Sequence, residues 1–307
     1  MTKTKQSPRF WLALIIFSLV GQVAWVVENM YLNVFIYKMF AASPSEVSLM
    51  VGASAVAATL TTVFMGALSD KLGKRKIFIC GGYILWGISI CAFALIRMEI
   101  LTTLFGTVAA ASVGVSAVVL LDCLMTFFGS TANDAAFNAW LTDATADGGR
   151  GRAEGINAMM PLMAVLVVFG GFMGCDRSKA DDWSAIFLII GVSVLLIGFA
   201  GLFLLEETAC KREGNEHFWS NIFYGFRPRV ISNNRSLYFT LIGFAVFGIS
   251  IQIFMPYLIL YYTVSLKMDN YVLIMAPASI LAAVFTAFWG RVYDKVRFKK
   301  SVIPALI

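Results

Sequence analysis

The sequence predicts an all-α membrane protein with eight transmembrane helices and the start of a ninth. The chain is 59% hydrophobic and 14% charged, whereas soluble domains are about 45–50% apolar and about 25% charged. Eight apolar segments reach the length of about 20 residues that a helix needs to cross a bilayer. These run lengths override the two soluble domains that a chain of 307 residues would otherwise suggest.

The expected helices follow one another with short polar connections. They span 10–38, 47–69, 77–97, 112–140, 156–174, 184–205, 237–264 and 270–290, and a ninth begins at about 301. The apolar segment 98–111 is expected to form a connection on the outer side, between the third and fourth helices.

The basic residues predict how these helices are oriented. If the N-terminus is inside, 19 of the 24 Lys and Arg residues fall in inner segments, as the positive-inside rule requires. We therefore expect a multi-pass protein of the cell inner membrane with a cytoplasmic N-terminus. The same rule accounts for the net charge of +6, so nucleic acid is not an expected partner.

The sequence offers little material for an enzyme. It has one histidine, His217, and five cysteines without metal-ligand or CxxC spacing. No nucleotide-binding loop and no nucleophile–base pair is evident. We expect no catalytic residue, no metal and no cofactor.

The longest polar stretch divides the chain into halves. We expect a six-helix bundle over 1–206, a cytoplasmic loop over 207–236 and a partial second bundle over 237–307. The apolar and aromatic residues of 218–226 have helical spacing, which predicts an interfacial helix in the loop.

A repeated motif supports the two-half organisation. "GALSDKLGKRK" at 66–76 recurs as "GRVYDKVRFKK" at 290–300, each after an even-numbered helix. Parallel repeats of this kind occur in some secondary transporters. Gly66 is expected to permit close helix contact and Gly73 a tight turn, while Asp70 can pair with a basic neighbour.

The first copy resembles the signature loop of the major facilitator superfamily. The matching residues are Gly66, Leu68, Asp70, Lys71, Gly73, Lys74 and Arg75, and the degenerate second copy keeps Gly290, Asp294 and Lys295. The resemblance implies a fold of twelve helices and a loop that latches the inner gate. About four helices would then be absent, and we expect these 307 residues alone not to transport.

A finer resemblance concerns the fourth helix. Asp134, Phe137 and Thr145 are similar to a stretch of the glycoside–pentoside–hexuronide:cation symporters, the melibiose carrier-like branch, which implies that Asp134 binds sugar. That carrier has two cation-binding acids on its second helix, where this chain has Ala58 and Thr62. A sodium site of that type is therefore not expected.

Polar residues inside the apolar helices mark candidate sites, because they are costly there. On the first helix, Gln22, Trp25, Asn29 and Asn33 share one face, whereas Glu28 lies about 100° away. On the fourth helix, Asp122, Thr126, Ser130, Asn133, Phe137 and Trp140 form a stripe with Asp134 at its edge. Hydrogen bonds or packing between helices would explain the same residues without transport.

The favoured interpretation is cation-coupled sugar or glycoside symport by a monomer in the lipid bilayer. The expected substrate-binding residues are Asp134, Asn133, Asp122, Asn29, Trp25, Asn138 and Tyr257. The expected coupling residues are Glu28 and Asp122, with a proton favoured over sodium because burial favours a neutral carboxyl group. A drug or lipid exporter and a non-transporting receptor or interaction protein remain alternatives.

Overall fold

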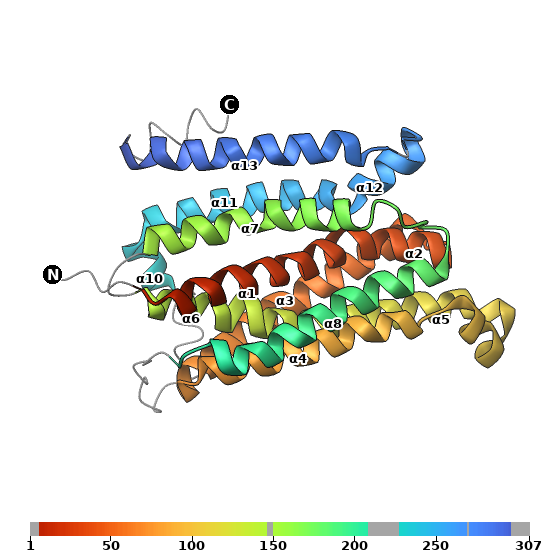
Figure 1. The fold of residues 1–307 in the computed structure, drawn as a ribbon, viewed down its shortest axis with the longest axis horizontal. Helices are drawn as coiled ribbons and strands as arrows, with labels where there is room; N and C mark the ends of the chain where they lie inside the picture. The colour runs from red at the N-terminus through yellow and green to blue at the C-terminus, as the bar shows by residue number, and fades with distance from the viewer. Residues whose placement is uncertain (1–5, 146–149, 208–226, 269, 296–307) are drawn as a thin grey trace.

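A computed structural model describes residues 6–145, 150–207, 227–268 and 270–295, with the side chains of 151 and 286–295 left out. The regular structure of these residues is helical, and the helices lie side by side in an elongated bundle (Figure 1). Seven helices are long and apolar enough to cross a membrane, and Val272–Phe285 forms a shorter apolar helix. The predicted all-helical membrane fold is confirmed at this level.

Several spans are assembled from consecutive helical pieces. The first span joins α1 (Pro8–Val26), the π-helix η1 (Val27–Tyr31) and α2 (Leu32–Phe40). The second and third are α3 (Pro44–Leu72) and α4 (Arg75–Ala92), the latter extended by η2 (Phe93–Leu95). The fourth joins α5 (Met98–Gly129), the π-helix η3 (Ser130–Phe137) and α6 (Asn138–Ala144).

The remaining helices follow the same antiparallel course. The fifth and sixth spans are α7 (Arg150–Gly171) and α8 (Ala180–Leu204). After the short α10 (Pro228–Asn233), the seventh joins α11 (Arg235–Phe254), η6 (Met255–Tyr257), α12 (Leu258–Leu260) and the π-helix η7 (Tyr261–Ser265), and α13 (Val272–Lys295) follows.

The segment 98–111, expected as a connection between the third and fourth helices, is itself helical and is counted within α5. Two helical stretches meet there at Gly106, whose φ of +80° is open to glycine but strained for other residues. The expected interfacial helix at 218–226 and the start of a ninth helix lie outside the described residues.

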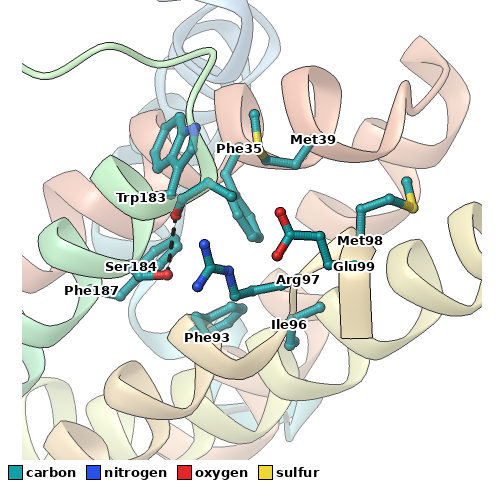
Figure 2. Close-up of a pocket in the computed structure, with 11 residues that line it drawn as sticks. Phe35, Met39, Phe93, Ile96, Arg97, Met98, Glu99, Trp183, Ser184 and Phe187 are labelled. Atoms are coloured by element: carbon teal, nitrogen blue, oxygen red, sulfur yellow. Dashed lines mark hydrogen bonds between the residues drawn. The ribbon is translucent and has the colours of Figure 1, made fainter. Parts of the chain in front are cut away.

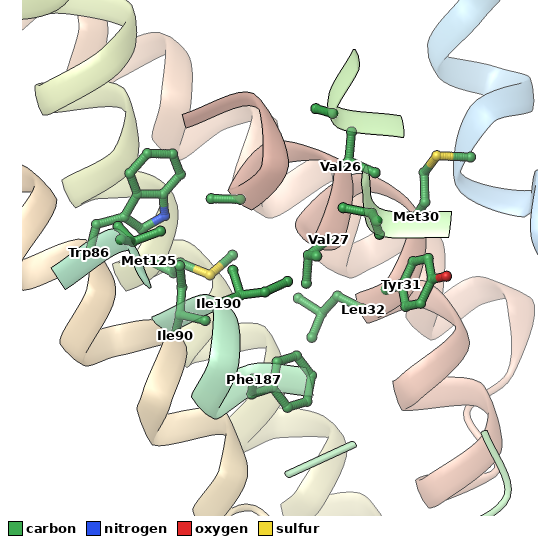
Figure 3. Packing of buried hydrophobic residues seen from close by; sticks show 14 of the residues in the cluster. Val26, Val27, Met30, Tyr31, Leu32, Trp86, Ile90, Met125, Phe187 and Ile190 are labelled. Atoms are coloured by element: carbon green, nitrogen blue, oxygen red, sulfur yellow. The ribbon is translucent and has the colours of Figure 1, made fainter. Parts of the chain in front are cut away.

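The first six spans pack through large aromatic side chains and through glycines. A Cβ added to Gly87 of α4 would lie 2.6 Å from the Gly191 oxygen of α8, and one on Gly191 would lie 2.8 Å from the Gly87 oxygen. Glycine is thus required on both sides, as in other close helix contacts in membranes. Figure 3 shows the adjoining core, where Trp86 and Ile90 of α4 meet Ile190 and Phe187 of α8.

The bundle has a basic end and a far end. The basic end carries the start of α1, the turn before α4 and the start of α10, and the far end carries the opposite connections (Figure 1). The far-end connections run over 41–43, 96–97, 172–179 and 266–271. Burial of the seventh span is concentrated at this far end: α11 buries none of its residues, whereas Pro256 and Leu258–Leu260 are buried.

Candidate functional site

A cavity of about 490 Å³ lies between the first, second, fourth and seventh spans. Most of its polar lining comes from side chains that are rare inside membranes. The lining residues are Gln22, Trp25, Glu28, Asn29, Val51, Ser54, Ala55, Ala58, Thr126, Asp134 and Gln252. The cavity therefore collects polar groups from helices far apart in sequence, including one from the second half.

Two carboxyl groups form a buried pair beside the cavity, which Glu28 lines and Asp122 does not. Glu28 is 7% exposed and Asp122 is 1% exposed, and the two groups are close enough to repel each other when charged. Thr126 Oγ1 donates a hydrogen bond to Glu28 Oε1 at 2.9 Å, and the Ser54 side chain lies beside Asp122. Glu28 Oε2 and Asp122 Oδ1 are buried without a hydrogen-bond partner, which leaves acceptor positions for a proton or a cation.

Asp134 faces the cavity from the fourth span. Ser130 Oγ donates to Asp134 Oδ2 at 2.9 Å, which fixes the carboxylate on the cavity side of the helix. Trp25 and Asn29 line the same cavity from the first span, and the Asn29 amide nitrogen donates to the Trp25 carbonyl at 2.9 Å. Trp25 is backed by the Trp86 ring, 5.0 Å away between centroids.

Two π-helices set which acids reach this cavity. Glu28 belongs to η1 and Asp134 to η3. A π-helix bonds i to i+5, so each turn holds more residues than the 3.6 of an α-helix and the following side chains rotate. The stripe expected from α-helical periodicity is displaced in this way, and Asp134 replaces Asn133 on the cavity side.

Asn133 is consequently a correction to the predicted binding residues. Its amide nitrogen donates to the Tyr83 hydroxyl at 2.7 Å, and that hydroxyl donates to the Phe17 carbonyl at 2.7 Å. Asn133 therefore joins the fourth span to the third and first, inside the packed core. It does not line the cavity.

Two further predicted binding residues, Asn138 and Tyr257, are not among the residues that line the cavity. Asn138 donates to the Asp134 carbonyl of its own helix at 3.1 Å, and Tyr257 contacts α3 at the far end. Phe137 and Trp140 are buried and stacked on each other, 5.6 Å between centroids. For these two aromatics, packing is the role that the structure shows.

Ser54 of the cavity and Tyr83 of the adjoining core were not predicted from the sequence. Ser54 stands one helical turn before Ala58, so continuing that face of the second helix would have found it. Tyr83 was missed because its role depends on a long-range contact with Asn133 that no local pattern signals.

The signature loop forms an ion-pair network at the basic end. Arg75 is 4% exposed and pairs with Asp70, with Asp143 Oδ2 at 3.2 Å and with Ser69 Oγ at 2.6 Å. Gly73 ends α3 with φ of +62°, which the tight turn requires. The network ties α3, α4 and α6 together.

Among the other residues of the two loop copies, Gly66 differs from the expectation. A Cβ on Gly66 would lie 3.9 Å from the Ala135 Cβ, an ordinary contact, so close packing does not require glycine there. Lys71 lies exposed in the last turn of α3. Gly290, Asp294 and Lys295 lie in the last turns of α13, and their side chains are outside the described part of the chain.

A second, smaller pocket of about 50 Å³ lies at the far end and shares no lining residue with the cavity. Figure 2 shows Arg97 in this pocket, opposite Trp183 and Ser184 of α8. Arg97 also forms an ion pair with Asp181. This pair connects the start of α5 to the start of α8.

A helical membrane protein with a polar cavity among its spans has the architecture of a carrier for small molecules. The model of the Major Facilitator Superfamily matches residues 8–307. The chain therefore belongs to that superfamily, whose members are secondary transporters that bind small molecules within the lipid bilayer. No curated protein matches the chain.

Proposed function

We propose that the protein is a proton-coupled symporter of a sugar or glycoside that works by alternating access. The observation that carries this proposal is the buried Glu28–Asp122 pair, with one unpartnered oxygen on each acid, beside a cavity that also holds Asp134. Coupling requires a cation site and a substrate site that sense each other, and Glu28 of the pair lines the same cavity as Asp134.

The substrate class follows from the mixture of groups in the cavity. Asp134 offers acceptor oxygens, while Gln22, Asn29 and Gln252 carry both donors and acceptors. Sugar hydroxyls donate and accept, so they match such a lining. The Trp25 ring provides an apolar surface of the kind that the C–H face of a sugar ring covers.

A proton is the favoured coupling ion because the two acids are so deeply buried. Two adjacent carboxylates in apolar surroundings cannot both stay charged without a large cost, and one shared proton removes most of it. Sodium would need several well-placed oxygen ligands. The cavity face of α3 supplies only the Ser54 hydroxyl, with Ala55 and Ala58 beside it.

The orientation completes the proposal. The basic end faces the cytoplasm by the positive-inside rule, so the far end faces outward. Substrate and proton would enter from the far end, bind in the cavity and leave at the basic end.

The first prediction tests transport in right-side-out vesicles that contain the complete protein. A thermal-shift screen of sugars and glycosides first selects a ligand, and uptake of that ligand should accelerate under an inward proton gradient and collapse with a protonophore. Asp134→Asn should lower uptake by about tenfold or more, because a charged acceptor contributes about 1.5–3 kcal/mol. Asn138→Ala, on the same span but outside the cavity, is the matched control.

Three results would contradict the proposal in different ways. Uptake driven by sodium alone would exclude proton coupling. Efflux of amphiphiles without sugar uptake would indicate an exporter of the same superfamily. Unchanged flux in the Asp134→Asn variant would show that Asp134 does not bind the substrate.

A further inference from the structure

An arginine lies between two tyrosines at the far end of the bundle. The Arg177 guanidinium carbon is 5.4 Å from the Tyr31 ring centroid and 5.3 Å from the Tyr271 ring centroid. Its Nη2 also donates to the Tyr31 hydroxyl at 3.3 Å. Both distances from the guanidinium carbon to a ring centroid are within the range of about 6 Å for cation–π attraction.

The three residues come from three separate parts of the chain. Tyr31 belongs to the first span, Arg177 to the connection between α7 and α8, and Tyr271 to the connection before α13. Tyr31 and Tyr271 are fully buried, and the Tyr271 ring is stacked on Tyr262 at 6.0 Å between centroids. The arginine therefore bridges the first half and the second half.

A second contact between the halves lies at the same end. The Tyr257 hydroxyl is 2.6 Å from Ser48 Oγ and 3.1 Å from the Pro44 carbonyl, at the start of α3. Opening a path from this end into the cavity would separate the seventh and eighth helices from the first and second. Both contacts would have to break.

The same π-helix carries a gate residue and a coupling residue. η1 contains Glu28, one of the two acids of the buried pair, and Tyr31, which contacts Arg177. They are three positions apart in the chain, and η1 also contacts η6 and α12 of the second half. A shift of this segment would move both groups together.

We propose that Arg177, held between Tyr31 and Tyr271, is the outer gate of the transporter, and that η1 links it to the charge state of Glu28. This gate rests on the proposed function only for the side of the membrane that the far end faces. A charged Glu28 is stabilised by water, so it favours the state in which the far end opens to solvent. A neutral Glu28 favours the arrangement seen here, in which Arg177 lies between Tyr31 and Tyr271.

The link to pH lies in Glu28 and its neighbours, not in the arginine. Burial is the largest influence on the Arg177 pKa and lowers it, but Tyr31 and Tyr271 raise it, and the net pKa lies above its ordinary value. Arg177 therefore stays charged over the whole physiological range. The titratable groups around Glu28 are Asp122, Asp134 and Cys123.

The experiment measures opening of the far end without any substrate. Ala55 lines the cavity and is exposed, so Ala55→Cys is introduced after the five native cysteines are replaced by serine. A membrane-impermeant thiol reagent is added to the far side of right-side-out vesicles. Arg177→Ala should raise the labelling rate about tenfold or more, since a desolvated cation–ring contact contributes up to about 2 kcal/mol.

A control and a second variant make the test decisive. Lys179→Ala lies in the same connection and removes an exposed cation that pairs with Asp176 at 3.5 Å, so it should leave labelling unchanged. Glu28→Gln, which mimics the neutral acid, should slow labelling. If Arg177→Ala labels no faster than Lys179→Ala, the gate is wrong, and if Glu28→Gln has no effect, the link through η1 is wrong. Since no transport is measured, failure of sugar symport would leave both results interpretable.

Discussion

The two ends of the bundle are held together by different kinds of contact. At the basic end, Arg75 pairs with Asp70 and Asp143, and all three belong to the first six spans. At the far end, Arg177 and Tyr257 join the first half to the second. The difference indicates that the basic-end network stabilises one rigid half, whereas the far-end contacts control how the halves meet.

The largest effect is expected at the basic end. Arg75→Ala would remove the ion pairs with Asp70 and Asp143 and the hydrogen bond to Ser69 Oγ, and a hydrogen bond to a charged group contributes about 1.5–3 kcal/mol. We expect a clear loss of thermal stability in detergent, followed by size-exclusion chromatography after heating. Lys74→Ala, an exposed neighbour, should be close to wild type. An Arg75→Ala protein that melts normally but labels faster at the far end would reverse the comparison.

Packing inside the first half should give the next largest effect. A Cβ on Gly191 would meet the Cys91 Sγ at 2.5 Å and the Cys91 nitrogen at 2.8 Å. Gly191→Val should therefore cost about 1–3 kcal/mol through overpacking, measured by the same melting experiment. Gly243→Val in α11 meets nothing within 4 Å and serves as the control. Equal destabilisation by both variants would show that α4 and α8 are not a specially close pair.

The smallest effect is expected from one hydroxyl at the far end. Tyr257→Phe removes its contacts with Ser48 and Pro44, and a hydrogen bond of this kind contributes about 0.5–1.5 kcal/mol. Far-side labelling of Ala55→Cys should rise by less than in Arg177→Ala, while the melting temperature stays unchanged. Tyr261→Phe, which keeps its ring beside Tyr262, should label at the wild-type rate. A change in melting without a change in labelling would assign Tyr257 a structural role only.

The helices could be predicted from sequence because apolar length is a direct physical requirement of the membrane. Each of the eight predicted ranges overlaps a helix of the structure. The helical stretch before Gly106 was not predicted, because an apolar segment of this length does not show whether it forms a helix or an irregular connection.

The candidate site was predictable only in part. Glu28, Trp25, Asn29 and Asp134 reach the cavity, and rarity in the membrane was enough to find them. Asn133 was misplaced because an α-helical period was applied across a π-helix. Tyr257 lies outside the cavity because Pro256 and the short helices of the seventh span interrupt the regular helical period that the prediction assumed.

The π-helix η3 has a consequence for how this site can change. The position of Asp134 in the cavity depends on one helix holding extra length between Ser130 and Phe137. A single-codon deletion there would restore regular turns and swing the acid away, with every neighbouring side chain still present. The chemistry of the cavity is therefore more fragile toward insertions and deletions than toward substitutions, and relatives of unequal length in this span would be poor guides to its substrate.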